Sequence, residues 1–419
     1  MLNKIAAPAA LITLLLAACA PGEIASARSD VPRITSPQVD PDQLDELAKG
    51  NMSFALNFYQ QIATSKDGNV VFSPYSIYSA LAMLYAGARG DTESQMADAL
   101  HYTLFQDALH AAFNQLDLSL DEANGEGFQL NVTNAAWGQP GFGFEQTYLD
   151  TLASHYGAGL NLVDFATDPE SARQTINQWV EDETEDKIVD LLPPGSVTDL
   201  ARLVLTNAIY LKAKWLNPFD AGSTADAPFT LLDGSTVTVQ MMNKRTSYQV
   251  ASGDGWRAIA VPYEGERMAM VIVVPDAGTF AQFEAGLDAA PMNSIIESVQ
   301  ASQPADVDLR MPRFDFGTDV NLKEALAALG ITDAFDPALA DFSGIDGPAS
   351  ELFVQGAFHK ATITVDEEGT EAAAASALVI GVESMPMQFN VDRPFLFTLV
   401  DNETGTLLFL GRVLNPVAG

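Results

Sequence analysis

Three apolar runs constrain the fold of this chain more than any other feature of its sequence. The segments "MAMVIVVP" (268–275), "PFLFTLV" (394–400) and "LLFLGRVL" (407–414) each have the length of a β-strand and contain almost no polar side chains. A strand with one solvated face alternates apolar and polar residues, so continuous runs of this kind predict strands that are buried on both faces. The chain must therefore cover at least part of a sheet with other layers.

Helical patterns accompany these strands. Phe54, Phe58 and Ile62 recur every four residues, as on one face of a helix, and "DPDQLDELAKG" before them supplies a capping aspartate and Pro41 for a first turn. Helical patterns dominate before about residue 190 and strand patterns after it, which indicates the α+β class. No internal repeat and no second change of composition divides the chain, so we expect one large domain over residues 42–419.

The first residues are typical of an export signal. Lys4 is followed by an apolar stretch, residues 5–16, that is too short to span a bilayer. The stretch ends in "LAAC" (16–19), which resembles a bacterial lipobox and predicts a signal peptide over residues 1–18 with a lipid on Cys19. An ordinary secretory signal followed by a chance cysteine is the alternative, although the only cysteine of the chain lies where acylation needs it.

The segment after Cys19 predicts a tether. Residues 19–41 are rich in Pro, Ser, Ala and Gly and show no periodicity, which is typical of a flexible linker. Ala20, where an aspartate would favour retention in the inner membrane, indicates sorting to the outer membrane. We therefore expect an exported bacterial lipoprotein anchored in the outer membrane, on its periplasmic or cell-surface side. One cysteine allows no disulfide within the chain, so stability must come from the core.

Charge and motifs exclude several classes of function. The net charge is −34, which argues against nucleic acid and anionic lipid surfaces as partners, so we expect membrane contact only through the lipid anchor. Solubility explains this acidity most simply, and selectivity for basic partners is the alternative. No nucleophile elbow, zinc helix or phosphate loop occurs, and His101, His110 and His155 lack a matching ligand set, so we expect neither metal nor cofactor. His359 lies in a strand-like run, "LFVQGAFHKATITV", where a buried imidazole needs polar partners.

Four long segments resemble the serpin family. They are "NVVFSPYSIYSALAMLYAGARGDTESQM" (69–96), "LVLTNAIYLKAKWLNPFD" (203–220), "LFVQGAFHKATITVDEEGTEAAAASA" (352–377) and "RPFLFTLVDNETGTLLFLGRVLNP" (393–416). The resemblance implies one domain of about three sheets and eight or nine helices, metastable in its intact form. It also implies an exposed reactive-centre loop, about residues 367–390, that a target serine protease attacks as a substrate. In inhibitory serpins the cleaved loop then inserts into the main sheet and drags the covalently bound protease across the molecule.

The loop sequence suits such an insertion. Side chains of a strand alternate between its faces, so Gly369–Gly381 can be divided into two sets. One set is uncharged throughout: Thr370, Ala372, Ala374, Ser376, Leu378 and Ile380. The other carries the only charge of the run: Glu371, Ala373, Ala375, Ala377, Val379 and Gly381. Gly369 can supply hinge dihedral angles that other residues resist, and Glu367 precedes it in the motif. We therefore expect an inhibitory serpin, with a non-inhibitory substrate, binding or structural protein as the alternative and a hydrolase disfavoured.

Loop length places the scissile bond. Counting from Gly369, and independently from "RPF" (393–395), the resemblance implies cleavage between Glu383 and Ser384, so residues 369–383 would form the new strand. Glu383 predicts a target with a basic, glutamate-preferring specificity pocket. Cleavage after Val382 or Met385 would instead favour an elastase-like or chymotrypsin-like target.

The resemblance also assigns roles away from the loop. It implies a buried hydrogen-bond cluster under the opening sheet, called the shutter, and a tryptophan at the breach, where the loop first enters. The shutter residues are Ser73, Ser76, Asn207 and His359, and the breach residue is Trp215. Core packing alone is the alternative for each of them. Lys and Arg are too sparse for a heparin-type site, and we expect a monomer.

Overall fold

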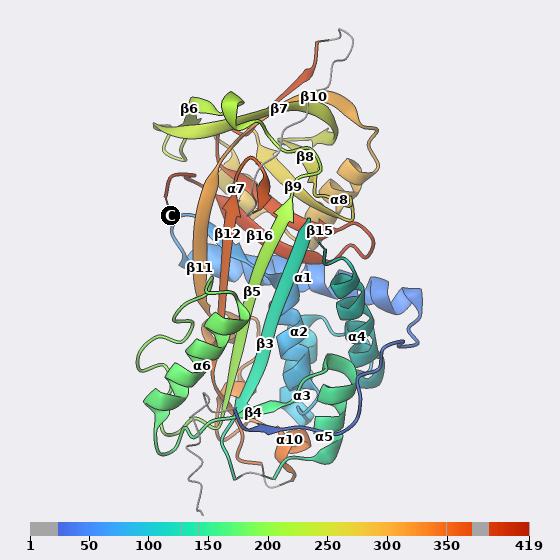
Figure 1. The fold of residues 1–419 in the computed structure, drawn as a ribbon, viewed down its shortest axis with the longest axis vertical. Coiled ribbons are helices and arrows are strands. Elements are labelled where there is room, and N and C mark those ends of the chain that lie inside the picture. The colour runs from blue at the N-terminus through green and yellow to red at the C-terminus, as the bar shows by residue number, and fades with distance from the viewer. Residues whose placement is uncertain (1–23, 126, 142, 349, 371–384, 419) are drawn as a thin grey trace, which may run out of the picture.

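The computed structural model describes residues 24–125, 127–141, 143–348, 350–370 and 385–418. A sheet of long strands runs along the molecule and has helices against both of its faces (Figure 1). Within the described ranges there are ten α-helices, against the eight or nine expected. They are α1 Pro41–Ser65, α2 Pro74–Tyr85, α3 Gly90–Leu100, α4 Gln106–Glu122, α5 Gln146–Thr151, α6 Pro169–Glu183, α7 Phe280–Ala285, α8 Ala289–Gln300, α9 Leu322–Ala328 and α10 Ser343–Asp346.

The long sheet contains seven strands in the order β1-β4-β3-β5-β12-β11, with β13 paired to β5 outside this path. Their bounds are β1 Ser26–Ala27, β3 Phe128–Gly138, β4 Leu160–Leu162, β5 Leu203–Lys214, β11 Phe314–Asn321, β12 Val354–Val365 and β13 Gly369–Thr370. We call the end at which β5 begins the base, and the end at which it stops the head. The central strands β5 and β12 are parallel and pair directly from the base up to Ala361 and Ile209.

The remaining nine strands follow the order β14-β10-β7-β8-β9-β15-β16-β2, with β6 also paired to β7. Their bounds are β2 Val70–Phe72, β6 Ala225–Thr230, β7 Thr236–Gly253, β8 Trp256–Pro262, β9 Met268–Pro275, β10 Ala305–Pro312, β14 Met387–Asn390, β15 Phe395–Asp401 and β16 Leu407–Val413. Strand β7 pairs with β6 and β10 along most of its length and with β8 at its end. It therefore joins two sheets, which together with the long sheet make the three expected.

The elements predicted from periodicity are confirmed. Every residue of β9, β15 and β16, the three apolar runs, is buried. Helix α1 begins at Pro41 with Asp40 as its N-cap, in a capping box with Gln43. Phe54, Phe58 and Ile62 of the same helix are buried.

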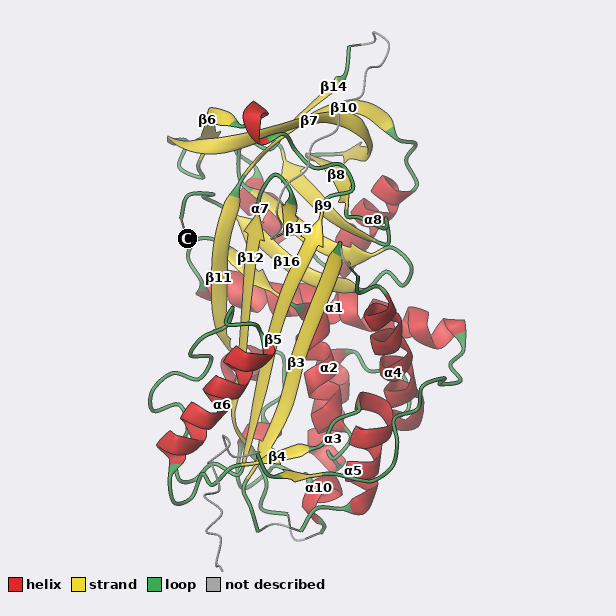
Figure 2. Cartoon of the chain, in the orientation of Figure 1, coloured by secondary structure: helices red, strands yellow, loops and turns green. Residues whose placement is uncertain are grey.

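Alternate residues of β5 pack against different layers, which explains why its sequence is apolar on both faces. Val204 and Ala208 face outward, in small clusters to which α6 contributes Ile176 and Val180. Leu205 and the other apolar inward residues belong to the main core. Figure 2 shows α6 crossing one face of the sheet while α2 lies behind the other.

Residues 24–40, which we call the N-terminal strap, lie against the domain and are not a free tether. Ser26 and Ala27 pair with β4, and the Ile34 amide donates to the Ser154 carbonyl oxygen at 2.9 Å. The Arg33 guanidinium contacts two side chains of α4, Asn114 and Asp117. The flexibility predicted for residues 19–41 is therefore corrected for this part. The signal peptide and Cys19 lie outside the described residues. No helix of the described part is long and apolar enough to cross a membrane.

Candidate functional site

The long sheet has a notch between β5 and β12 at its head. The two strands separate above their last pair, Ala361 and Ile209. A hollow of about 200 Å³ opens there, lined by Tyr210 and Leu211 of β5 on one side and by residues of β12, including Thr362, on the other. Strand edges that face such a gap can pair with a further strand. The notch is therefore a place where the sheet can accept one more strand.

Two residues of the loop hinge already occupy the head of this notch. Gly369 pairs antiparallel with Lys214, and Thr370 pairs with Ala213. Thr370 is 2% exposed, and its hydroxyl oxygen lies 2.8 Å from that of Tyr263. A Cβ atom at Gly369 would collide with the Ala213 carbonyl oxygen and lie 2.8 Å from the Lys214 Cα. Glycine is therefore required here by close backbone approach as well as by the hinge role predicted for it.

A buried carboxylate fixes the chain just before the hinge. Glu367 is 4% exposed, accepts hydrogen bonds from Arg313 and from the Thr224 hydroxyl, and forms an ion pair with Arg313. Burial alone would raise the pKa of Glu367, but the hydrogen bonds from Arg313 and Thr224 outweigh it and hold the pKa below its usual value. This carboxylate is therefore charged at neutral pH and ties the hinge to Arg313, between β10 and β11, and to the segment before β6.

Trp215 holds the same turn from the other side. Its indole N–H donates to the Asp366 carbonyl oxygen at 3.0 Å, and its backbone N–H donates to the Glu368 carbonyl oxygen at 2.8 Å. The ring stacks on Tyr263 with centroids 4.5 Å apart and an interplanar angle of 11°. The predicted breach tryptophan thus contacts both the start of the loop and the tyrosine that meets Thr370.

The four residues predicted to form the shutter lie together, halfway down the sheet. His359 of β12 and Asn207 of β5 are direct partners across the seam, and their side chains are hydrogen bonded. The Asn207 amide also donates to the Ser76 hydroxyl at 2.5 Å. The Ser73 hydroxyl caps α2 through the Ser76 N–H, and the Ser73 N–H donates to His359 Nε2 at 3.1 Å. Parting β5 from β12 must break the bond between Asn207 and His359.

The protonation state of His359 follows from its partners. Because Nε2 accepts the Ser73 N–H, the ring proton lies on Nδ1 and is donated to the Asn207 side-chain oxygen. The ring is 1% exposed, and burial lowers the pKa of His359 to about 3. An imidazolium at this position would direct a second N–H against the Ser73 N–H. The shutter is therefore built for a neutral histidine.

Four further residues take part that the sequence did not reveal. Asn134 of β3 accepts a hydrogen bond from Asn207 and extends the shutter by one strand. Tyr263 meets Thr370, while Arg313 and Thr224 hold Glu367. Asn134 in "LNVTNAAWG" (130–138) was the one available signal, since an amide on the inward face of a strand needs partners.

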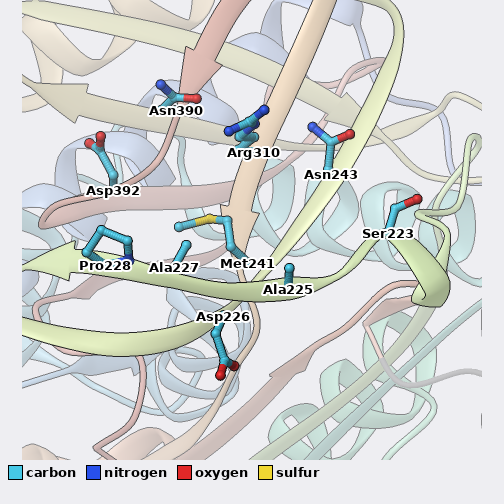
Figure 3. Close-up of a pocket in the computed structure, with 10 residues that line it drawn as sticks. All are labelled: Ser223, Ala225, Asp226, Ala227, Pro228, Met241, Asn243, Arg310, Asn390 and Asp392. Atoms are coloured by element: carbon cyan, nitrogen blue, oxygen red, sulfur yellow. The ribbon is translucent and has the colours of Figure 1, made fainter.

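The return side of the loop leads into β14. Residues 371–384, which contain the rest of the insertion segment and the predicted bond between Glu383 and Ser384, lie outside the described residues. The chain resumes at Met385, which is 97% exposed, and β14 pairs parallel with β10. A hollow of about 410 Å³ adjoins β14, and Figure 3 shows Arg310 in it between Asn390 and Asn243. No group of three or more potential metal ligands occurs among the described side chains.

Comparisons with known proteins agree with this geometry. The family model described as Serpin (serine protease inhibitor) matches residues 49–416. An uncharacterized serpin-like protein of Thermococcus kodakarensis is 38% identical over 372 residues, which cover 88% of this chain and 85% of the relative. The leukocyte elastase inhibitor of Homo sapiens is 35% identical over 384 residues, which cover 89% of this chain and all of the relative.

Solved structures show the same likeness. The structure of the thermophilic serpin tengpin in its native state superimposes with a TM-score of 0.82 at 25% identity, covering 94% of this chain and 100% of that one.

Proposed function

The chain belongs to the serpin family, and on this premise we propose that it is an inhibitory member that traps serine proteases as a suicide substrate. The protease serine attacks the carbonyl carbon of Glu383, the peptide bond to Ser384 breaks, and Ser384 leaves with a free amino group. The acyl ester then links the protease to Glu383. Insertion of residues 369–383 between β5 and β12 carries the linked protease away and distorts its active site before water completes hydrolysis.

The observation that carries this proposal is the hinge already paired at the head of the sheet. Gly369 and Thr370 face Lys214 and Ala213 of β5, and the notch continues below them. If this antiparallel register continues, each step of one residue forward along the loop moves its partner one residue back along β5. In this register Ala372, Ala374, Ser376, Leu378 and Ile380 face Leu211, Ile209, Asn207, Leu205 and Leu203. All five β5 residues are buried, so the uncharged set of the loop would enter the core.

The charged position fits the same register. Glu371 would face Lys212, which is exposed in β5 although the residues on either side of it are buried. Opposite charges directly across an antiparallel pair stabilise it modestly. The only charge of the insertion run would therefore meet solvent and a basic partner. A loop selected only to be cut would not need this agreement.

We further propose a glutamate-preferring target, because Glu383 would occupy the specificity pocket of the protease. A basic pocket gains from a carboxylate and rejects an apolar side chain that leaves its charge unpaired. If the bond used is instead the one after Val382 or after Met385, the target would be elastase-like or chymotrypsin-like. We also propose that the protein acts as a monomer, attached through a lipid on Cys19 to the outer membrane of a bacterial cell.

The test uses the mature chain, residues 19–419, with Cys19→Ser to keep it free of lipid. It is mixed with a glutamate-selective serine protease and analysed on denaturing gels. We expect an adduct that resists denaturation and a released peptide that begins at Ser384. Glu383→Arg is the matched variant, since it should transfer adduct formation to an arginine-specific protease. Cleavage at this bond without any adduct would overturn the inhibitory function and favour a non-inhibitory serpin.

A further inference from the structure

The N-terminal strap directs the start of the chain to the base of the long sheet. Strand β1 is antiparallel to β4, β4 is parallel to β3, and β3 is antiparallel to β5. Strand β1 therefore runs from base to head, like β5, and the chain that precedes it leaves toward the base. The Leu162 amide donates to the Ala25 carbonyl oxygen at 2.7 Å, and Ile24 packs against the apolar cluster under α6, so this direction is fixed up to residue 24.

The inserted loop would also end at the base of the long sheet. In the register set by Gly369 and Thr370, Ile380 faces Leu203, the first residue of β5, and Glu383 lies three residues beyond it. Strand β1 is separated from the inserted strand by β4, β3 and β5, which is four steps of about 4.8 Å, or roughly 19 Å. The acyl-linked protease and the exit point of the N-terminus would therefore be neighbours at the base.

We propose that, on a membrane, this inhibitor can complete trapping only if the N-terminal strap detaches from the domain. The inference rests on the proposed inhibitory function and on the lipid at Cys19. With the strap in place, the anchor is joined to the domain by residues 19–23 alone, and five extended residues span roughly 17 Å. The docked strap thus keeps the base of the domain close to the lipid surface, whereas the hinge at Gly369 and Thr370 lies at the head.

A serine protease is too large for the gap between the base of the domain and the membrane. A serine protease of about 220 residues has a radius of gyration of roughly 17 Å, hence a diameter of about 44 Å. Insertion would deliver this body to a base that a docked strap holds within roughly 17 Å of the membrane. Detachment frees residues 24–40, and 17 further extended residues add roughly 56 Å of reach. The released strap would therefore provide the room that the complex needs.

The contacts of the strap are of a kind that can be released. Only two residue pairs join β1 to β4, and the ion pair between Arg33 and Asp117 is partly exposed at both ends. The Asn114 side chain holds the Ile34 carbonyl oxygen at 2.7 Å. Most of these contacts are polar, and the apolar side chains that the strap adds, Ile24, Ala27 and Val39, are only partly buried against the core clusters. Detachment therefore uncovers little apolar surface.

The experiment compares one protein free and anchored. The mature chain is coupled through its Cys19 thiol to maleimide lipid in phosphatidylcholine vesicles, and the Cys19→Ser protein serves as the free form. The readout is the amount of inhibitor consumed per protease trapped, measured by titration of protease activity and by the ratio of adduct to cleaved protein on gels. We expect this amount to at least double on vesicles, because delayed insertion allows hydrolysis of the acyl ester.

Two inserts and one substitution test the cause. A flexible 20-residue Gly/Ser insert between residues 22 and 23 should restore the value of the free protein. The same insert in the exposed turn at Gly234, between β6 and β7, adds mass without lengthening the connection to the anchor. It should leave the amount of inhibitor consumed on vesicles unchanged. Arg33→Ala, which weakens the strap, should restore the value in part while leaving the free protein unchanged.

The outcomes separate the two proposals. If the free protein forms no adduct with any protease tried, the proposed function fails and this inference fails with it. If the free protein forms an adduct and the anchored protein is equally efficient, the function stands and the strap proposal is overturned. A loss on vesicles that the insert before residue 23 does not restore also overturns it, because reach would then not be the cause.

Discussion

If the chain is an inhibitor as proposed, a charge placed at Thr370 should convert it into a plain substrate. Thr370 is the first loop residue that faces inward; it is 2% exposed and lies against Tyr263. Thr370→Glu forces a carboxylate into this site. In the intact protein the hinge can withdraw from β5, because only two residue pairs hold it. The inserted form has no such escape, since the residue would lie between β5 and β12.

The size of the effect follows from the cost of an unpaired buried charge. An uncompensated charge in a protein interior costs about 3–5 kcal/mol. In the variant, insertion of the withdrawn hinge must begin again at position 370, so most of this cost enters the barrier, and about 3 kcal/mol slows a rate by a factor on the order of 100. Hydrolysis of the acyl ester occurs in the protease and keeps its rate. If insertion is about ten times faster than hydrolysis in the parent protein, it becomes about ten times slower than hydrolysis in the variant.

The assay is the ratio of adduct to cleaved protein on denaturing gels after reaction with a protease that the parent protein traps. Glu371→Thr is the matched control, because it makes the reverse exchange at the next residue, which the alternation assigns to the solvent face. We expect mainly adduct for the parent and for Glu371→Thr, and mainly cleaved protein for Thr370→Glu. An unchanged ratio for Thr370→Glu would refute the view that trapping proceeds by insertion from this hinge.

Three further predictions concern stability. Because burial lowers the pKa of His359 to about 3 from an unfolded value of 6.5, only the unfolded state binds this proton between those pH values. His359→Asn should therefore reduce the slope of unfolding free energy against pH over that window by up to about 1.4 kcal/mol per pH unit; an unchanged slope would contradict the assignment. Arg33→Ala should lower the free energy of unfolding by about 1 kcal/mol, through loss of the partly exposed pair with Asp117, and should speed hydrogen exchange in residues 24–40; unaltered exchange would show that Arg33 does not hold the strap. Gly369→Ala should expel β13, because the added Cβ meets the Ala213 carbonyl oxygen, and exchange should rise at the Ala213 amide while that of β9 stays constant.

Features set by local patterns were predictable. The start of α1 depends on residues adjacent in sequence, Asp40, Pro41 and Gln43. The burial of β9, β15 and β16 depends on runs that no solvated strand would carry. The shutter was accessible because its members lie inside long family motifs. A strand-embedded histidine such as His359 also demands partners on physical grounds alone.

Features set by single long-range contacts were not predictable. The strap is held largely through its backbone, by the pairing of β1 and the hydrogen bonds of Ala25 and Ile34, and by the side chain of Arg33. Backbone contacts leave no pattern in side chains. Composition was therefore the only signal in this segment, and its Pro, Ser, Ala and Gly content indicated flexibility. The contact between Glu367 and Arg313 joins residues 54 positions apart, and nothing near either residue marks the other. The hinge paired at Gly369 and Thr370 likewise depends on the geometry of a notch that forms only in the folded sheet.

If the chain traps proteases as proposed, the same contacts would let the intact protein persist above a more stable, inserted form. Opening the sheet separates β5 from β12 and breaks the bond between Asn207 and His359 before any loop residue has reached that level. The free-energy cost of separating the two strands therefore precedes the gain from new pairing, and it forms a kinetic barrier. Each residue inserted afterwards replaces one parallel pairing by two antiparallel ones, which are slightly more stable per residue. Ser376 would face Asn207 in this register and offer its hydroxyl to the amide that His359 has left, so the shutter that resists opening also accepts the new strand.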